Sequence, residues 1–383
     1  MSDIPRRIGI LTGGGDCPGL NAVIRAVAKT ALCEGTEVMG IEDGYLGLIE
    51  DRIRPLSYLD VSGILTRGGT ILGSNNKANP SDYAVPDGRG GWVRRDVRDQ
   101  VVDNYYRAGL DALVVIGGDG TMSGAAKLIE RGLNVVGVPK TIDNDLWATE
   151  VTFGHDTAVA TATDALDKLH TTASSHHRVM VLELMGRNAG WLTLHAGLAS
   201  GSDVILIPEI PFRMETVAAK CLGRSRGGKG FTIVAVGEGA APLGGEQTVD
   251  KVIETSPEPV RLGGVSKHVA DEIERISGLE SRAIILGHVQ RGGTPTARDR
   301  VLATGFGYHA FELLRAGRFG RVVVQQAGRI SSAPIAEVAD KVRTVPPDHP
   351  LIAAARATGA CFGDEDECPD TPDIRAARTH GVR

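Results

Sequence analysis

The string Pro139-Lys-Thr-Ile-Asp-Asn-Asp145 brings several groups that could do chemistry into one short stretch. A cation, a hydroxyl and two carboxylates follow directly on an aliphatic run. A carboxylate in such a place can take the proton of an attacking hydroxyl group, and a second can assist a metal ion or hold the loop. Asp143 is therefore a candidate general base, and Asp145 a candidate metal ligand or loop anchor. An Asx turn would explain one of these acids but hardly the entire string.

Two glycine-rich strings also follow aliphatic runs, Gly13-Gly-Gly-Asp-Cys-Pro-Gly19 and Gly117-Gly-Asp-Gly-Thr121. Glycines leave backbone N–H groups open to a phosphate, and the N-terminus of a following helix favours an anion. Asp119 adds a carboxylate with which Mg²⁺ could bridge the protein and a phosphoryl donor, and a helix N-cap is its structural alternative. Neither string matches the dinucleotide fingerprint or the P-loop, which disfavours a standard dehydrogenase or P-loop enzyme.

Arginines form a third, dispersed group close to the ends of apolar runs. Forked guanidinium groups suit a phosphorylated substrate, so their recurrence in such places favours one. Any one of them alone would more often be a solvated surface charge. The group comprises Arg178, Arg187, Arg282 and Arg291, with His288 close to the last.

The elements that must position these groups alternate in an α/β pattern. The first half predicts strands at Ile8–Thr12, Ala112–Ile116 and Asn134–Val138, the last ending at Pro139, and helices at Leu20–Ala31 and Thr121–Glu130. Parallel strands joined by helices bring such loops together at the carboxyl ends of the strands. A second sheet is predicted from strands at Val179–Leu184, Val204–Ile207, Phe231–Val236 and Ala283–Leu286. We expect residues 75–91 and 240–247 to be exposed loops, and the tail beyond Cys361 to be partly mobile.

Composition narrows the class of protein. A chain of 383 residues has room for two or three domains, and a net charge of −5 argues against a nucleic-acid partner. No apolar stretch approaches the roughly 20 residues that span a bilayer, so we expect no membrane association. Five scattered cysteines without a C-x-x-C pair predict neither a disulfide framework nor a zinc site. With no targeting signal recognised, these features favour the cytoplasm.

Taken in order, the chemical motifs resemble those of the phosphofructokinase family over most of residues 6–345. The matching stretches are Gly13–Asn21, Arg67–Thr70, Gly117–Thr121, Pro139–Asp145, Met185–Arg187, Glu238 and His288–Arg291. The resemblance implies an α/β fold of two Rossmann-like lobes, with mostly parallel sheets flanked by helices and an active site in the cleft between them. The phosphoryl-donor-binding lobe would comprise residues 1–153 and about 290–345, and the fructose 6-phosphate-binding lobe residues 154–289 and about 346–383.

The resemblance also implies a function. The chain would be a glycolytic 6-phosphofructokinase, a Mg²⁺-dependent phosphotransferase that converts fructose 6-phosphate to fructose 1,6-bisphosphate. It would assemble with itself as a tetramer or dimer with shared active sites. Arg178 and Arg282 match two arginines that the family brings from a neighbouring subunit.

Carried over by position, the family's site falls on these residues. The catalytic residues would be Asp143, Lys140 and Arg187, and the metal ligands Asp119 and Asp145. Donor contacts would come from Gly15, Gly118, Asp119, Gly120, Thr121 and Lys77. Substrate contacts would come from Thr141, Ile142, Asp143, Arg178, Met185, Gly186, Arg187, Glu238, Arg282, His288, Val289, Gln290 and Arg291.

Two positions bear on whether the donor is ATP or pyrophosphate. Lys140 is similar to the residue of pyrophosphate-dependent members, whereas Gly120 is of the ATP type. The pairing resembles a mixed-substrate subgroup, and we favour ATP because Gly120 leaves room for a nucleotide. Many relatives carry a donor-binding arginine at the position of Asn76, and Lys77 would take its place here.

Other functions stay open on the residues alone. NAD and lipid kinases share the Gly117–Thr121 string, but they are not expected to share the Pro139–Asp145 string or the His288–Arg291 cluster. A regulator that binds nucleotides or sugar phosphates without catalysis is the second alternative. It would need no base, which weighs against it because both Asp119 and Asp143 are present.

Overall fold

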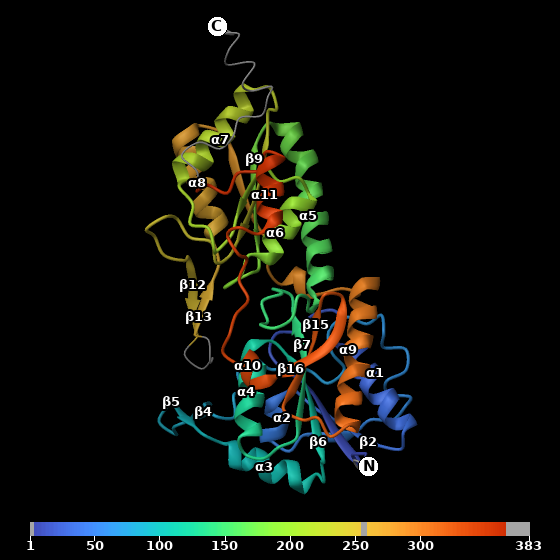
Figure 1. The fold of residues 1–383 in the computed structure, drawn as a ribbon. Coiled ribbons are helices and arrows are strands. Elements are labelled where there is room, and N and C mark those ends of the chain that lie inside the picture. Colours follow the sequence, from blue (N-terminus) through green and yellow to red (C-terminus); the bar gives the residue numbers. More distant parts are fainter. Residues whose placement is uncertain (1–3, 254–258, 365–383) are drawn as a thin grey trace. The chain divides into compact units, whose positions relative to one another are not determined.

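The structure is a computed structural model that describes residues 4–253 and 259–364. The chain divides into two compact units (Figure 1). The first comprises residues 4–157 and 291–343, together with Ile253 and Pro259. The second comprises residues 158–252, 260–290 and 344–364. None of the helices in these described ranges combines the length and the apolarity that crossing a bilayer requires.

The first unit is built on an eight-stranded sheet with the order β16-β15-β7-β6-β1-β2-β3, in which β8 also pairs with β7. All neighbours are parallel except β2 with β3 and β15 with β16, the pairs at the two edges. The strands are β1 (Arg7–Thr12), β2 (Glu37–Ile41), β3 (Ile53–Pro55), β6 (Ala112–Gly117), β7 (Val135–Thr141), β8 (Phe153–Gly154), β15 (Arg321–Gln326) and β16 (Arg329–Pro334). The parallel core explains the continuous apolar runs, because helices cover both faces of such a sheet.

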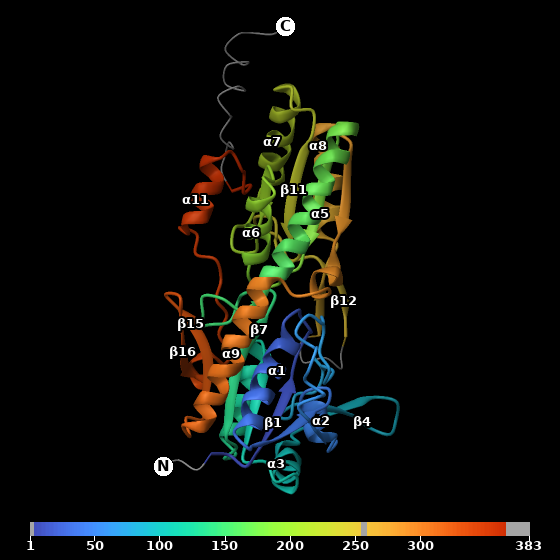
Figure 2. The ribbon, with the colours of Figure 1, turned by 90° about the vertical axis from the view of Figure 1, so that its right-hand side faces the viewer.

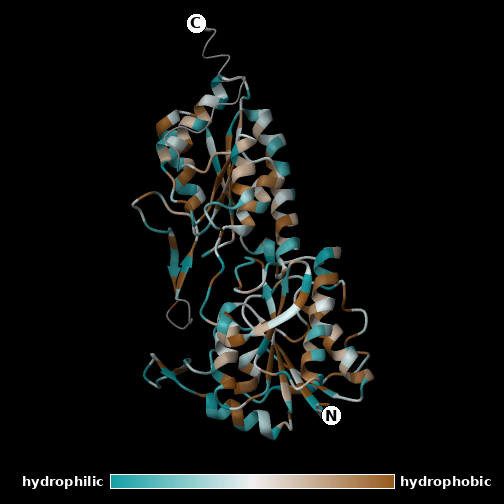
Figure 3. Cartoon of the chain, in the orientation of Figure 1, coloured by the Kyte–Doolittle hydropathy of each residue, from teal (hydrophilic) through white to brown (hydrophobic). Residues whose placement is uncertain are grey.

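Helices lie on both faces of this sheet (Figure 2). Those of one face share a buried core with the strands, in which Met122 and Leu128 meet Leu113 and Val115. They are α2 (Tyr45–Ile49), α3 (Arg98–Arg107), α4 (Asp119–Ile129) and α10 (Ile335–Val338). On the other side α1 (Leu20–Cys33) packs along α9 (Ala297–Arg315). Figure 3 shows apolar residues gathered along the strands, as burial on both faces requires.

The second unit is built on a four-stranded, all-parallel sheet with the order β10-β11-β9-β14. Its strands are β9 (Val179–Leu184), β10 (Val204–Leu206), β11 (Thr232–Gly237) and β14 (Ser281–Ile285). Alternate residues of β9 enter different cores: Val179 and Val181 pack with α7 (Met214–Arg226) and α8 (Val265–Ser277), and Leu182 packs with α5 (His155–His176). The unit also holds α6 (Trp191–Ala199), α11 (Pro350–Ala357) and the hairpin of β12 (Val249–Val252) with β13 (Val260–Leu262). The 3₁₀ helix η1 (Gly287–Arg291) follows β14.

The predicted end of one strand at Pro139 is wrong, because β7 continues to Thr141. Proline has no N–H to donate, so it needs a strand position that lacks a partner on one side. Here β6 pairs with Pro139 through Gly117, whereas β15 pairs with β7 only as far as Gly137. The last residues of β7, Lys140 and Thr141, then pair with β8.

Three further expectations change. Helix α4 begins at Asp119 rather than Thr121, and Gly118 is its N-cap residue. The expected loop 75–91 contains β4 (Tyr83–Pro86), which forms a hairpin with β5 (Trp92–Arg95). Cys361 forms a disulfide bond, which the scattered cysteines did not predict. Of the tail beyond Cys361, residues 365–383 lie outside the described residues, so its expected mobility is not tested.

Candidate functional site

The end of β7 carries a buried lysine into the first glycine-rich loop. Lys140 is 4% exposed, and its Nζ donates to the carbonyl oxygen of Gly15 at 2.5 Å. Burial lowers the pKa of the Lys140 amine, and the Asp119 and Asp143 carboxylates act in the opposite direction. A buried cation among carboxylates beside a glycine loop is suited to a phosphate group.

Two carboxylates follow Lys140 in the same loop, separated by Asn144. Asn144 has a left-handed backbone (φ 54°), and its side chain accepts from the N–H of Thr152 at 2.9 Å. The N–H of Asp143 donates to Thr141 Oγ1 at 3.1 Å. Burial, followed by the charges of Asp143 and Asp119, raises the pKa of Asp145 to about 8. The three acids therefore lie close enough to repel one another, and a cation would relieve this repulsion.

The residues at this place fit a magnesium ion that also binds a phosphorylated substrate. Among the described residues, no group of three acidic, histidine or cysteine side chains is arranged to hold a metal. Mg²⁺ usually keeps several waters and takes only one or two carboxylates, together with substrate phosphates. Asp119, in the first turn of α4, and Asp145 could supply those carboxylates.

The two glycine-rich loops differ in the backbone N–H groups and the space that they leave available to a ligand. In the first, Gly13 and Gly14 already donate their N–H groups to the carbonyls of Ile116 (2.9 Å) and Asn75 (3.2 Å), so the expectation of open amides does not hold for these two. In the second, a Cβ added at Gly117 would lie 2.3 Å from Thr121 Cβ, whereas one at Gly120 would meet nothing within 4 Å. The space for a ligand is therefore at Gly120, beside the N-terminus of α4.

Arg291 also contacts the first glycine loop. Its Nη1 donates to the carbonyl of Asp16 at 3.1 Å, and a Cβ on Gly15 would lie 2.7 Å from the same nitrogen. Only glycine allows this close approach. The guanidinium that the resemblance assigns to the sugar therefore lies on the loop assigned to the donor, and both belong to the first unit.

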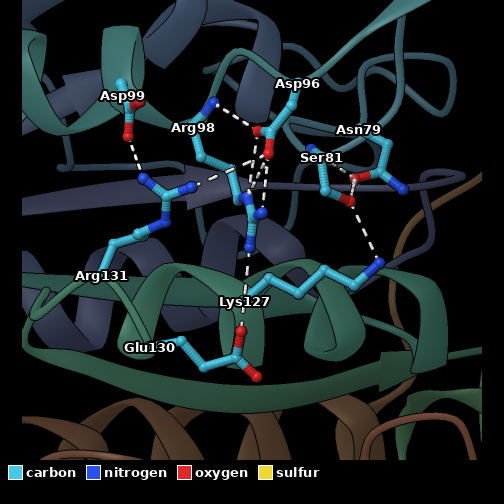
Figure 4. A network of polar contacts seen from close by, with 8 residues as sticks. All are labelled: Asn79, Ser81, Asp96, Arg98, Asp99, Lys127, Glu130 and Arg131. Atoms are coloured by element: carbon cyan, nitrogen blue, oxygen red, sulfur yellow. Dashed lines mark hydrogen bonds and ion pairs between the residues drawn. The ribbon is translucent and has the colours of Figure 1, made fainter.

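Ser81, four residues after Lys77, and residues 96–99 contact α4 and the residue Arg131 that follows it (Figure 4). Lys127 of α4 donates to Ser81 at 3.0 Å, and Arg98 pairs with Asp96 at 2.7 Å and Glu130 at 3.8 Å. Arg131 joins the network through Asp96 and Asp99. Lys77 itself is exposed, and its N–H donates to Asn75 Oδ1.

In the second unit, the loop after β9 carries Met185, Gly186 and Arg187. The N–H of Met185 donates to Gln290 at 3.3 Å and that of Gly186 to Glu238 at 3.4 Å. Arg187 Nη1 donates to the carbonyl of Val260 at 2.9 Å. The structure thus gathers several of the predicted sugar-binding residues around one loop.

The other predicted contacts vary in exposure. His288 is exposed and Val289 is 63% exposed, whereas Gln290 is fully buried. Ile142 is also fully buried, so its side chain is not available to a substrate.

Arg178 and Arg282 lie at the other end of the second sheet. Arg178 directly precedes β9, and Arg282 is the second residue of β14. Both pair with Glu280, which lies 2.8 Å from Arg178 Nε. Met185 follows the last residue of β9, and six residues of strand span about 20 Å. The expectation that all the arginines occupy comparable places at strand ends is therefore wrong for these two, because parallel strands have two distinct ends.

Several buried polar residues were missed by sequence reasoning. Glu183 in β9 accepts from the N–H of Gly264 and from both the N–H and the hydroxyl of Ser266 at 2.9–3.1 Å. His155 Nδ1 lies 2.6 Å from the carbonyl of Ile142, so it carries the proton. Glu209 and Arg343 likewise bond to backbone groups close to the candidate loops. The signal in the sequence that could have identified such residues is a single charged residue inside or beside an apolar run.

Glycine loops, a buried lysine and several carboxylates at the carboxyl ends of the parallel strands of one sheet define an α/β protein of the phosphate-binding class. The chain belongs to the phosphofructokinase family, which residues 7–314 match. The predicted family and the α/β fold class with mostly parallel, helix-flanked sheets are thereby confirmed.

The relatives include enzymes named for both phosphoryl donors. The chain is 50% identical over 361 residues to a Clostridium perfringens protein named ATP-dependent 6-phosphofructokinase 2, covering 94% of this chain and 99% of that one. It is 49% identical over 343 residues to the pyrophosphate–fructose 6-phosphate 1-phosphotransferase of Amycolatopsis methanolica, covering 89% and 97%. A crystal structure of Pichia pastoris phosphofructokinase in the T-state superposes with a TM-score of 0.75 and 31% identity, covering 93% of this chain and 37% of that one.

Proposed function

We propose that this chain is a 6-phosphofructokinase that transfers the terminal phosphoryl group of ATP to the 1-hydroxyl of fructose 6-phosphate. The observation that carries the proposal is the arrangement at the end of β7. Lys140 there donates a hydrogen bond to the Gly13–Gly15 loop, and Asp145 is close enough to Asp119 and Asp143 to be affected by their charges. A protein that only binds nucleotides needs no such group of acids. Names of relatives that are about half identical over nearly their full length support the same activity.

In the proposed reaction, Asp143 accepts the proton of the sugar hydroxyl while the hydroxyl oxygen attacks the terminal phosphorus of ATP. The bond from that phosphorus to the bridging oxygen breaks, and ADP leaves. Lys140 and the N-terminus of α4 stabilise negative charge on the phosphoryl oxygens. When bound, Mg²⁺ would neutralise charge on the donor phosphates, with Asp119 and Asp145 as its protein ligands. Asn144 and Thr152 hold the loop so that the two acids keep their positions.

The second unit would supply the sugar contacts. The Met185–Arg187 loop, with Glu238 and His288, would bind the sugar and its phosphate, and remote binding energy of this kind can position the reacting hydroxyl. Arg178 and Arg282 would serve the site of a neighbouring subunit, since they lie at the opposite end of the sheet from Met185. The proposal therefore includes a homo-oligomer with shared active sites.

Gly120 and Lys140 bear on which phosphoryl donor the enzyme uses. Open space at Gly120 supports ATP, because a larger donor can approach the N-terminus of α4 there. Pyrophosphate is the second candidate, supported by Lys140 and by the name of the Amycolatopsis relative. We favour ATP, which is also named for most of the similar relatives.

The test is the formation of fructose 1,6-bisphosphate from fructose 6-phosphate and Mg²⁺, with ATP and pyrophosphate supplied separately at equal concentration. We expect product with ATP. Product with pyrophosphate alone would assign the second donor, and no product with either would refute the proposed function.

We also infer a cytoplasmic location, where charged sugar phosphates and ATP are retained. Cell fractionation with an antibody against the chain should recover it with cytoplasmic markers, and recovery in a secreted or periplasmic fraction would contradict the inference.

A further inference from the structure

One arginine near the end of the first unit holds the loop that follows Asp143. The N–H of Arg343 donates to the carbonyl of Asp145 at 2.7 Å, and its Nη2 donates to the carbonyls of Asn144 (2.7 Å) and Glu150 (3.0 Å). The preceding residue, Val342, forms an antiparallel bridge with Leu146. Arg343 therefore bonds to both ends of the segment 144–150.

Arg343 also interacts electrostatically with two carboxylates of this loop, Asp145 and Glu150. Burial lowers the pKa of its guanidinium, while the charges of Asp145 and Glu150 act in the opposite direction. A planar guanidinium that bonds two carbonyls is more strongly oriented than a lysine amine would be. The arginine is thus placed to fix the position of the Asp145 backbone.

Two residues further along, the chain is anchored in the second unit. The N–H of Val345 donates to Glu209 Oε1 at 2.7 Å, and the N–H of Gly190 donates to the same carboxylate at 2.9 and 3.1 Å. Gly190 ends the loop that begins with Met185 and is the N-cap residue of α6. Val345 is 1% exposed and packs in one core with Ala189.

We propose that residues 342–345, here called the strap, couple the position of the Asp143–Asp145 loop to that of the Met185–Gly190 loop. Arg343 and Glu209 are its positioning residues; neither is proposed to touch the substrate. Only Thr344 separates the two anchors, so a shift of one anchor along the chain must be taken up at this residue or passed on to the other anchor. The inference rests on the proposed function, which assigns the proton acceptor to one loop and sugar contacts to the other.

The experiment compares wild type, Arg343→Ala, Glu209→Gln and the double variant. Steady-state kinetics give kcat and KM, and calorimetry measures fructose 6-phosphate binding without donor or metal. We expect Arg343→Ala to lower kcat by about 10²-fold, the cost of displacing a reacting group by roughly 1 Å. It should also weaken sugar binding several-fold, although its bonds lie in the first unit. Arg329→Ala and Glu215→Gln, on exposed residues, should match wild type.

The double variant decides whether the two anchors act through one strap. Independent sites have additive free energies, so their fold-losses multiply. The strap predicts instead that the double variant is close to the worse single variant, because either change alone releases the coupling. Multiplying losses, or unchanged sugar binding in Arg343→Ala, would overturn the inference. If Arg343→Ala does not fold, Arg343→Lys, which keeps the charge and loses the fork, is judged by the same criteria.

Amide hydrogen exchange separates this inference from the proposed function. With Arg343→Ala, exchange at Gly190 and Val345 should become faster in the absence of any substrate. Unchanged exchange there refutes the strap whatever the enzyme's activity. A wild-type protein that forms no fructose 1,6-bisphosphate refutes the proposed function, and faster exchange would still support the mechanical coupling.

Discussion

At the scale of single residues, Asn144 separates Asp143 from Asp145 in the loop after β7, and its role differs from theirs. Asn144 takes a left-handed backbone, which asparagine tolerates better than most residues, and its side chain bonds within the loop. Its role is therefore structural. Asp143 and Asp145 are left for the chemistry, one as the proposed base and the other as the proposed metal ligand.

Replacing the proposed base should affect turnover far more than binding. Asp143→Ser is expected to lower kcat by about 10²- to 10⁴-fold, because the attacking hydroxyl loses its proton acceptor. Fructose 6-phosphate binding, measured by calorimetry, should stay within a few-fold of wild type. The control is Asp103→Ser on the exposed surface of α3. Turnover close to normal in Asp143→Ser would remove Asp143 from the mechanism.

A carboxylate at Gly120 should change the choice of donor. The site has room for a side chain, so Gly120→Asp should fold. Its charge would oppose the phosphates of ATP, and we expect the ratio of ATP to pyrophosphate activity to fall by about 10²-fold. Gly120→Ala adds the Cβ without the charge and should keep the wild-type ratio. An unchanged ratio in Gly120→Asp would show that donor choice is made elsewhere.

At the scale of elements, buried carboxylates join strands to helix ends. Glu183 lies near the carboxyl end of β9, is 3% exposed, and accepts hydrogen bonds from the N-terminal turn of α8. Hydrogen bonds from backbone N–H groups and the helix dipole both favour a carboxylate there. These hydrogen bonds of Glu183 also hold the start of α8, which follows β13 in the chain. The carbonyl of Val260 in β13 accepts a hydrogen bond from Arg187.

Removing this charge should destabilise the second unit. Glu183→Gln keeps the shape but turns one acceptor into a donor that faces N–H groups, and we expect a loss of about 1–3 kcal/mol in unfolding free energy. Chemical denaturation followed by circular dichroism measures it. Glu215→Gln on the exposed face of α7 is the control. A loss no larger than the control's would mean that the carboxylate does not hold α8.

Glu209 should make stability depend on pH. Burial raises its pKa above the ordinary value of 4.5, although the N–H groups of Val345 and Gly190 act in the opposite direction. The folded state therefore binds the proton more tightly than the unfolded state. This contribution to stability is complete below pH 4.5 and is lost as the pH rises through the folded pKa.

Thermal unfolding of wild type and Glu209→Gln, compared from pH 4.5 to 8, tests this dependence. The advantage of wild type over the variant should shrink as the pH rises, because glutamine does not titrate. An advantage that grows with pH would show that the fold favours the ionised carboxylate.

At the scale of the whole molecule, the second sheet presents sugar-binding candidates at both ends of its strands. Arg178 and Arg282 share Glu280 at one end, and Met185 follows β9 at the other. One bound sugar cannot span about 20 Å. If all three serve the reaction, the two arginines must act on a different copy of the chain.

Mixing two inactive variants tests this sharing. Asp143→Ser and the double variant Arg178→Ala/Arg282→Ala should each be nearly inactive. Unfolding and refolding them together should restore activity, because a mixed oligomer contains sites with neither defect. Size-exclusion chromatography confirms that mixed oligomers have formed. If they form and activity stays at the level of the parents, the sites are not shared in this way.

The sequence by itself determined the local features of this protein. Apolar runs followed by glycines predicted the strands and loops of both sheets within a few residues, because burial on two faces demands continuous apolar residues. The residue types of the string from Pro139 to Asp145 were enough to predict a general base and a metal ligand or loop anchor. Motif order was enough to indicate the family, which the comparison with known proteins confirmed.

Only the tertiary structure decided which distant residues meet. The contacts of Arg343 with Asn144 and of Glu209 with Val345 join positions more than 100 apart in the chain. No local pattern encodes such pairs, since they depend on how strands are ordered in a sheet. The same holds for Pro139, which is tolerated inside a strand because the neighbouring strand ends before it. Tertiary packing, rather than the local structural propensity of each residue, determined these contacts and the place of Pro139 in β7.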